Sequence, residues 1–128
     1  MLRQKYPLLL VADDNADMRR YLGRVLSRQY RIALAKDGAE ALEQARTLRP
    51  DLILTDVVMP GESGRELAKR IAALVPAVPV LFTSGYTNGE IFRRGLLEPG
   101  ASFVQKPLTP QALVRAVQQT LDGVGRPA

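Results

Sequence analysis

Residues 8–14 read Leu-Leu-Leu-Val-Ala-Asp-Asp, an unbroken apolar run that ends abruptly at two acids. A short run without polar alternation is typical of a β-strand buried on both faces of a sheet. Such strands belong to parallel sheets, in which helices cover both sides. The run therefore predicts the first strand of an α/β protein, with two carboxylates at its carboxyl end.

The rest of the chain repeats this pattern of short strands and amphipathic helices. Further strands are predicted around Ile32 and Leu34, which precede an Asp37-Gly38 turn signal, and at 52–55, 80–83 and 101–104. Apolar residues recur at helical spacing over 16–29, 41–48, 67–74, 87–97 and 110–121. Thr109 followed by Pro110 is an N-cap signal for the last helix, whereas two glycines weaken the helix at 87–97.

Five alternating strand and helix pairs indicate a parallel sheet with right-handed crossovers and a helical layer on each face. This is the flavodoxin-like doubly wound (βα)5 fold, a five-stranded parallel sheet with strand order 2-1-3-4-5. The 128 residues are expected to form one domain, with a core from about 6 to 122. A turn is predicted at 98–100 and a loose tail at 123–128.

The composition narrows the class of function. The chain has no cysteine and no histidine, so it can use neither thiolate nor imidazole chemistry and cannot itself carry a phosphohistidine. No apolar run is long enough for a membrane span, and we expect a cytoplasmic protein without membrane insertion. The net charge of +5 comes from scattered basic residues without a stacking platform, which argues against direct nucleic-acid binding.

Polar residues collect at the carboxyl ends of the predicted strands, where doubly wound sheets form their sites. Asp13-Asp14 follows the first strand, Asp56 the third, Ser84-Gly85 the fourth and 105–107 (Gln-Lys-Pro) the fifth. Asp13-Asp14 alone could simply favour the start of the first helix through the helix dipole. That interpretation does not explain why Asp56 and Lys106 also follow buried runs.

Three carboxylates at one edge would repel one another unless a cation lay among them. Mg²⁺ suits carboxylate and carbonyl oxygens and keeps open positions for other ligands. We therefore expect an Mg²⁺ site, which Mn²⁺ could also fill. Asp14 and Asp56 are the expected direct ligands, with Asp13 acting through water.

Four stretches resemble the receiver domain of bacterial response regulators. They are 11–15 (Val-Ala-Asp-Asp-Asn), 56–61 (Asp-Val-Val-Met-Pro-Gly) with Gly64, 83–86 (Thr-Ser-Gly-Tyr) and 103–107 (Phe-Val-Gln-Lys-Pro). The resemblance covers practically the whole chain. The resemblance is strongest to receivers of hybrid sensor histidine kinases. It is carried by residues 84–86, Gly95, Leu97, 99–100, Phe103 and 105–107.

The resemblance implies a phosphoacceptor in a two-component phosphorelay, with Mg²⁺-dependent transfer from a partner phosphohistidine to Asp56. It implies that Asp13, Asp14, Asp56 and the Val58 backbone carbonyl bind the metal, and that Ser84 and Lys106 bind phosphoryl oxygens. Ser84 and Phe103 would act in a conformational switch, although a turn serine and a core phenylalanine are the plain alternatives. The Lys106-Pro107 bond is expected to be cis.

The same resemblance implies partners and an output. A sensor histidine kinase or a histidine phosphotransfer domain would donate the phosphoryl group, with Asn15, Arg19 and Leu22 as candidate contacts. Phosphorylation would favour one of two conformations and reshape a protein-interaction surface. The chain would then be a monomer or weak dimer that catalyses only its own phosphorylation and dephosphorylation, not a turnover enzyme.

Three other functions are compatible with parts of the pattern. A metal-dependent phosphohydrolase also forms an aspartyl phosphate, but it typically uses an Asp-x-Asp motif after the first strand. A flavodoxin-like ligand binder would need a phosphate loop rich in glycine or hydroxyls, where this chain has Asp13, Asp14 and Asn15. A receiver-like domain that only binds partners would not need the complete set of residues for phosphoryl acceptance that this chain has.

Overall fold

The structure is a computed structural model that describes residues 6–59, 62–75, 77–97 and 101–123. Its main sheet is parallel and contains β1 (Leu8–Ala12), β2 (Arg31–Ala35), β3 (Leu52–Asp56), β6 (Val80–Ser84) and β7 (Ser102–Gln105). Their spatial order is β2-β1-β3-β6-β7, which is 2-1-3-4-5 when only the strands of this sheet are counted. The predicted fold and strand order are confirmed.

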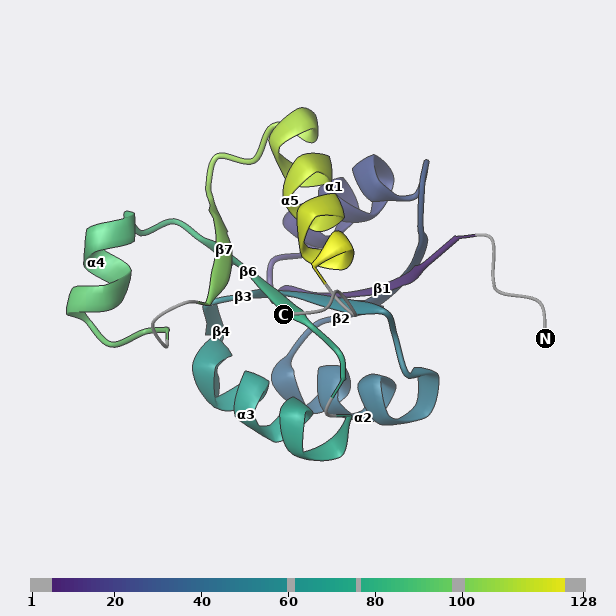
Figure 1. The fold of residues 1–128 in the computed structure, drawn as a ribbon, viewed down its shortest axis with the longest axis horizontal. Coiled ribbons are helices and arrows are strands. Elements are labelled where there is room, and N and C mark those ends of the chain that lie inside the picture. The colour runs from purple at the N-terminus through teal and green to yellow at the C-terminus, as the bar shows by residue number, and fades with distance from the viewer. Residues whose placement is uncertain (1–5, 60–61, 76, 98–100, 124–128) are drawn as a thin grey trace.

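Helices cover both faces of the sheet (Figure 1). In that view α1 (Ala16–Leu26) and α5 (Pro110–Asp122) lie above the sheet, whereas α2 (Gly38–Leu48) and α3 (Gly64–Leu74) lie below it. The short helix α4 (Asn88–Arg93) lies beyond the β6–β7 edge. The layers match the three-layer arrangement expected from alternating strands and helices.

The side chains of the central strands divide between the two layers. Leu9, Val11, Leu52 and Leu54 pack with α1 and α5, whereas Leu10 and Ile53 pack with α2 and α3. Their side chains are fully buried. Because burial of each such side chain stabilises the fold by about 1.5–3 kcal/mol, the unbroken apolar runs fix the sheet and the position of its carboxyl end.

Several helices begin at a capping side chain, and the first cap lies next to the acid pair. The Asn15 side chain accepts a hydrogen bond of 2.9 Å from the Met18 N–H. Thr109 caps α5 in the same way, with Pro110 at the first helical position as predicted. Such caps fix where each helix starts, so Asp13 and Asp14 are held between the end of β1 and the start of α1.

Several element boundaries differ from the prediction. Helix α1 ends at Leu26, and the N–H groups of Gln29 and Tyr30 both donate to the Leu26 carbonyl in the turn that leads to β2. Helix α4 spans only part of 87–97, because Gly95 adopts a positive φ of 67° just after its end. Helix α3 begins at Gly64, three residues earlier than its apolar pattern predicted.

The segment after Asp56 contains two short strands that the sequence patterns did not predict. β4 (Val58–Met59) pairs antiparallel with β5 (Glu62–Ser63) in a short hairpin. Strands of two residues are too short to show an alternating pattern in the sequence, which explains why they were missed.

Some sequence predictions fall outside the described residues. These are the turn at 98–100, the tail beyond Gly123, and residues 60–61 of the stretch that resembles receiver domains. Within the described part of the chain, none of the helices combines the length and apolar character needed to cross a bilayer.

Gly64 packs against the strand end that carries Asp56. Its N–H donates to the Val57 carbonyl at 2.6 Å, and a Cβ atom here would lie 2.8 Å from the Asp56 carbonyl oxygen and 2.9 Å from the Val57 Cα. These neighbours are backbone atoms, which cannot rotate away.

We expect Gly64→Ala to lower the unfolding free energy by about 1–3 kcal/mol through overpacking. Urea denaturation followed by circular dichroism measures it. Gly23→Ala is the matched control, since its Cβ would meet only ordinary contacts at 3.7 Å or more, and we expect it to be neutral or stabilising. Equal losses in the two variants would contradict this account of Gly64.

Candidate functional site

Backbone hydrogen bonds continue the parallel sheet one residue past the strands and fix the site residues there. The Asp13 N–H donates to the Ala35 carbonyl at 3.1 Å, and the Lys106 N–H donates to the Ser84 carbonyl at 2.7 Å. The Val57 N–H donates to the Thr83 carbonyl at 3.0 Å. The residues that follow β1, β3 and β7 are therefore held at one edge, as the topology predicts.

The structure brings the three predicted acids together at this edge. One carboxylate oxygen from each of Asp13, Asp14 and Asp56 lies within 4.8 Å of the others. Asp13 is buried, Asp56 is partly buried and Asp14 is exposed. They line a hollow of about 480 Å³ together with Asn15, Asp17, Met18, Tyr21 and Lys106.

Asp13 has the most unfavourable environment of the three. Burial raises the pKa of its carboxyl group, and the neighbouring charges of Asp56 and Asp14 raise this pKa further, against the lowering effects of the Asn15 N–H and Lys106. Its Oδ1 accepts from the Asn15 N–H at 2.9 Å, whereas its Oδ2 has no hydrogen-bond partner among the described residues. A buried carboxylate oxygen without a partner favours a bound cation.

Lys106 provides positive charge within the cluster. Its Nζ lies 3.0 Å from Asp56 Oδ2 and 3.9 Å from Asp13 Oδ2, and its side chain is 25% exposed. Asp56 Oδ1 accepts from the Val58 N–H at 3.1 Å. The peptide bond between Lys106 and Pro107 is cis.

Ser84 and Phe103 lie on neighbouring strands beside the cluster. Ser84 is buried, and its Oγ accepts a hydrogen bond from the Tyr86 N–H at 2.9 Å. Phe103 is half-buried and packs edge-to-face against Phe92 of α4, with ring centroids 6.3 Å apart. In this conformation the hydroxyl of Ser84 is hydrogen-bonded within its own loop, and Phe103 packs against α4.

The three candidate partner contacts differ in accessibility. Asn15 is exposed at the rim, and Arg19 is half-buried with its Nη1 donating to the Asp13 carbonyl. Leu22 is only 1% exposed and packs in the core shared by α1 and α5. The prediction for Leu22 is therefore wrong, because its side chain belongs to the inward apolar stripe of α1 and cannot reach a partner.

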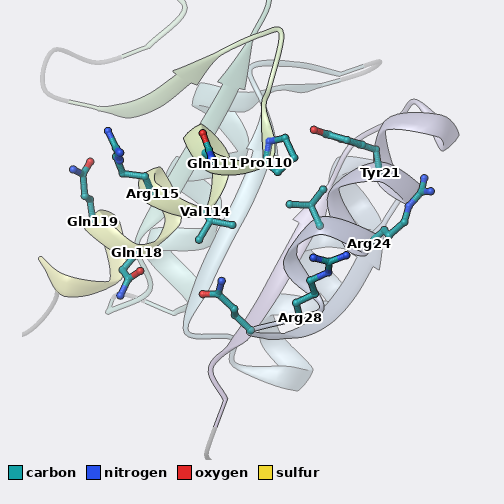
Figure 2. A pocket seen from close by; sticks show the side chains of 11 residues that line it. Tyr21, Arg24, Arg28, Pro110, Gln111, Val114, Arg115, Gln118 and Gln119 are labelled. Carbon is teal, nitrogen blue, oxygen red and sulfur yellow. The ribbon is translucent and has the colours of Figure 1, made fainter.

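A second hollow, which the sequence reasoning missed, lies between α1 and α5 (Figure 2). This α1–α5 groove has a volume of about 820 Å³ and an apolar floor that includes Val25 and Val114. Its other lining residues are Tyr21, Arg24, Arg28, Gln29, Pro110, Gln111, Arg115, Gln118 and Gln119. Tyr21 lines both hollows, and its hydroxyl donates to the Leu108 carbonyl at 2.6 Å.

The acid cluster fits a hard divalent cation. Its donors are carboxylate oxygens, the ligand type that Mg²⁺ and Mn²⁺ take, and the buried Asp13 Oδ2 has no hydrogen-bond partner among the described residues. Asp13, Asp14 and Asp56 are the residues that could hold such an ion. The exposed side of the hollow leaves room for further oxygen ligands.

Comparisons with known proteins agree with this fold. The family model of the response regulator receiver domain matches residues 9–118. The chain therefore belongs to the response regulator receiver domain family, whose function is to accept a phosphoryl group in two-component signalling.

Individual relatives and structures give the same result. The chain is 36% identical over 114 residues to hybrid signal transduction histidine kinase D of Dictyostelium discoideum. The matched region is 87% of this chain but only 7% of that kinase. The response regulator domain of Thermotoga maritima CheB superposes with a TM-score of 0.80 at 30% identity, covering 91% of this chain and 97% of that domain. Vibrio cholerae chemotaxis protein CheY4 gives a TM-score of 0.79 at 28% identity, covering 90% and 98%.

The raised pKa of Asp13 predicts a stability cost at neutral pH. Between the ordinary value of 3.8 and the higher pKa in the folded state, the folded protein holds a proton that the unfolded chain has lost. Stability contributed by this group is therefore greatest at low pH and is lost as the pH rises through that window.

We expect Asp13→Asn to raise the unfolding free energy in metal-free buffer at pH 7 by about 1 kcal/mol, because it removes a buried charge. Added Mg²⁺ should stabilise the wild type more than this variant. Thermal unfolding with and without Mg²⁺ measures both effects. Asp17→Asn, which removes one charge from an exposed side chain, is the control, and a similar stabilisation there would refute the role of burial.

Proposed function

We propose that Asp56 of this receiver domain accepts a phosphoryl group from the phosphohistidine of a sensor histidine kinase or a histidine phosphotransfer domain. The observation that carries the proposal is the cluster of Asp13, Asp14 and Asp56 with Lys106 Nζ 3.0 Å from Asp56 Oδ2. In a chain of net charge +5, such a concentration of acids beside one lysine supports phosphoryl and metal binding.

The transfer itself needs few groups. The Asp56 carboxylate attacks phosphorus, an oxygen–phosphorus bond forms, and the nitrogen–phosphorus bond to the donor histidine breaks. Lys106 already contacts Asp56 and would move to a phosphoryl oxygen, where its charge offsets the negative charge of the transition state. Because the ammonium is half-buried, this interaction is stronger than it would be in water.

A divalent cation completes the proposed site. Asp13, Asp14, Asp56 and the Val58 backbone carbonyl would hold Mg²⁺ or Mn²⁺, which would neutralise the carboxylates and bring positive charge to the phosphoryl oxygens. Asp13 would act through a water molecule, whereas Asp14 and Asp56 would bind the ion directly.

Ser84 and Phe103 are the proposed switch residues. A phosphoryl group on Asp56 offers the Ser84 hydroxyl a charged acceptor that is stronger than its present neutral acceptor, the Tyr86 carbonyl at 3.4 Å. Movement of that loop would change the space beside Phe103 and its contact with Phe92. The expected output is a reshaped surface around α4 and β7 that binds another protein.

We further propose that the domain acts as a switch and not as a turnover enzyme, and that residues from about 6 to 122 form one receiver unit. The proposed location is the cytoplasm, where histidine kinases present their donor histidines, and the proposed state is a monomer or weak dimer. Direct binding to nucleic acid is not part of the proposal.

The α1–α5 groove supports a docking face for the phosphodonor, together with Asn15. Tyr21 lines both the groove and the acid-lined hollow, which supports a partner that sits in the groove and reaches Asp56. Arg24 and Arg28 line the groove from α1 and the turn after it, and Arg115 from α5 (Figure 2), and within the described residues none of them forms an ion pair. Such a surface suits an amphipathic partner with acidic residues.

We expect the double change Arg28→Glu and Arg115→Glu to slow transfer from a phosphorylated protein donor about tenfold at low salt, since charge reversal at a rim mainly lowers the association rate. Arg46→Glu on α2, where Arg46 pairs with Glu43 at 2.9 Å, is the control on the opposite face. Stopped reactions with labelled donor measure the rates. Equal slowing by the Arg46 variant would exclude the groove as the docking face.

The central proposal is tested with acetyl phosphate and Mg²⁺ followed by intact mass measurement. We expect wild-type protein to gain the mass of one phosphoryl group and Asp56→Asn to gain none, because the amide cannot form the acyl phosphate. Omission of the metal should abolish the gain in the wild type. An equal mass gain in Asp56→Asn would show that another residue accepts the phosphoryl group.

A further inference from the structure

Arg19 reaches back from the first turn of α1 to the main chain of the acid pair. Its Nη1 donates a hydrogen bond of 2.8 Å to the carbonyl oxygen of Asp13. The side chain is half-buried, it does not line the acid-lined hollow, and it forms no ion pair within the described ranges. The guanidinium therefore contacts a neutral backbone group, the carbonyl of one of the three clustered acids.

This hydrogen bond completes the restraints on Asp13. The Asp13 N–H donates to the Ala35 carbonyl, and the carboxylate Oδ1 accepts from the Asn15 N–H. With the carbonyl held by Arg19, Oδ2 is the one polar atom of Asp13 without a hydrogen-bond partner in the described structure. Arg19 is itself anchored, because its N–H donates to the Asn15 carbonyl at 2.9 Å.

Arg20, the next residue, shows that this arrangement is not a general property of basic residues on α1. Its side chain is 73% exposed and lies 3.6 Å from Asp17, a solvated pair that contributes little. The two arginines carry the same charge and are adjacent in the sequence, but only Arg19 contacts the backbone of a site residue.

We infer that Arg19 is a positioning residue for the metal site: it fixes the Asp13 main chain so that the free carboxylate oxygen of Asp13 faces the cation. This inference rests on the metal site of the proposed function. It changes the predicted role of Arg19 from a contact with the phosphodonor protein to a support of the metal site. Outer partners of metal ligands commonly act in this way, by orienting the ligand.

A positioning role and a purely electrostatic role of Arg19 predict opposite changes in Mg²⁺ affinity when its guanidinium is removed. Removing a positive charge near an acidic site should strengthen Mg²⁺ binding, because it removes repulsion of the cation. Removing a group that orients a ligand should weaken binding, because the ligand must then be ordered when the ion arrives. The sign of the change in affinity therefore separates the two effects.

The test compares Mg²⁺ binding to the wild type, Arg19→Met, Arg19→Lys and Arg20→Met by calorimetric titration. Methionine keeps the aliphatic part of the half-buried arginine but has no donor. We expect the Kd of Arg19→Met to rise about tenfold, at the lower end of losses seen for outer partners of metal ligands. Arg19→Lys, which keeps a donor and the charge, should recover most of the affinity, and Arg20→Met should bind as tightly as the wild type or more tightly.

Thermal unfolding without Mg²⁺ separates positioning from a purely structural role. A structural role would lower the melting temperature of Arg19→Met and leave its Kd for Mg²⁺ unchanged, which would overturn the inference. An equal change of Kd in the Arg19 and Arg20 variants would overturn it as well. If the wild type failed to bind Mg²⁺, the proposed function would fail and this inference with it, whereas normal wild-type binding with unaffected variants would remove only the role of Arg19.

Discussion

Mutual repulsion among three carboxylates is the constraint on which the site depends. Asp13, Asp14 and Asp56 are brought together by the sheet, and Asp13 is buried so that its charge is poorly solvated. Lys106 offsets part of this charge, but its ammonium lies closer to Asp56 than to Asp13. The remaining imbalance is what a divalent cation would remove, and it makes the apo site less stable than a neutral one would be.

The fold maintains this unfavourable arrangement because the core around it is strongly apolar. The central strands bury their side chains on both faces, and backbone hydrogen bonds extend the parallel ladder to the site residues themselves. The start of α1 at Asn15 and the tight approach of Gly64 to Asp56 then leave these backbones little freedom. Stabilisation in the core thereby supports local destabilisation at the edge, which is common at functional sites.

Much of this could be predicted from the sequence, because apolar runs and turn signals are local. They predicted the strands, and the alternation of strands with helices predicted the strand order and the edge at which the acids gather. Leu22 was misassigned because the partner contacts came from the family resemblance, whereas its helical spacing with Leu26 places it on the inward apolar stripe of α1. The end of α4, the short hairpin after Asp56, the α1–α5 groove and the Arg19 hydrogen bond depend on positive φ, very short pairings or tertiary contacts, which leave no periodic signal.

The most direct measurement of the central claim is the position of a bound ion in crystals grown with Mn²⁺, located by its anomalous scattering. The account predicts a single strong peak at coordination distance from carboxylate oxygens of Asp14 and Asp56, next to Oδ2 of Asp13. A map without a peak at that position, or with the Lys106 ammonium in the place of the ion, would contradict it.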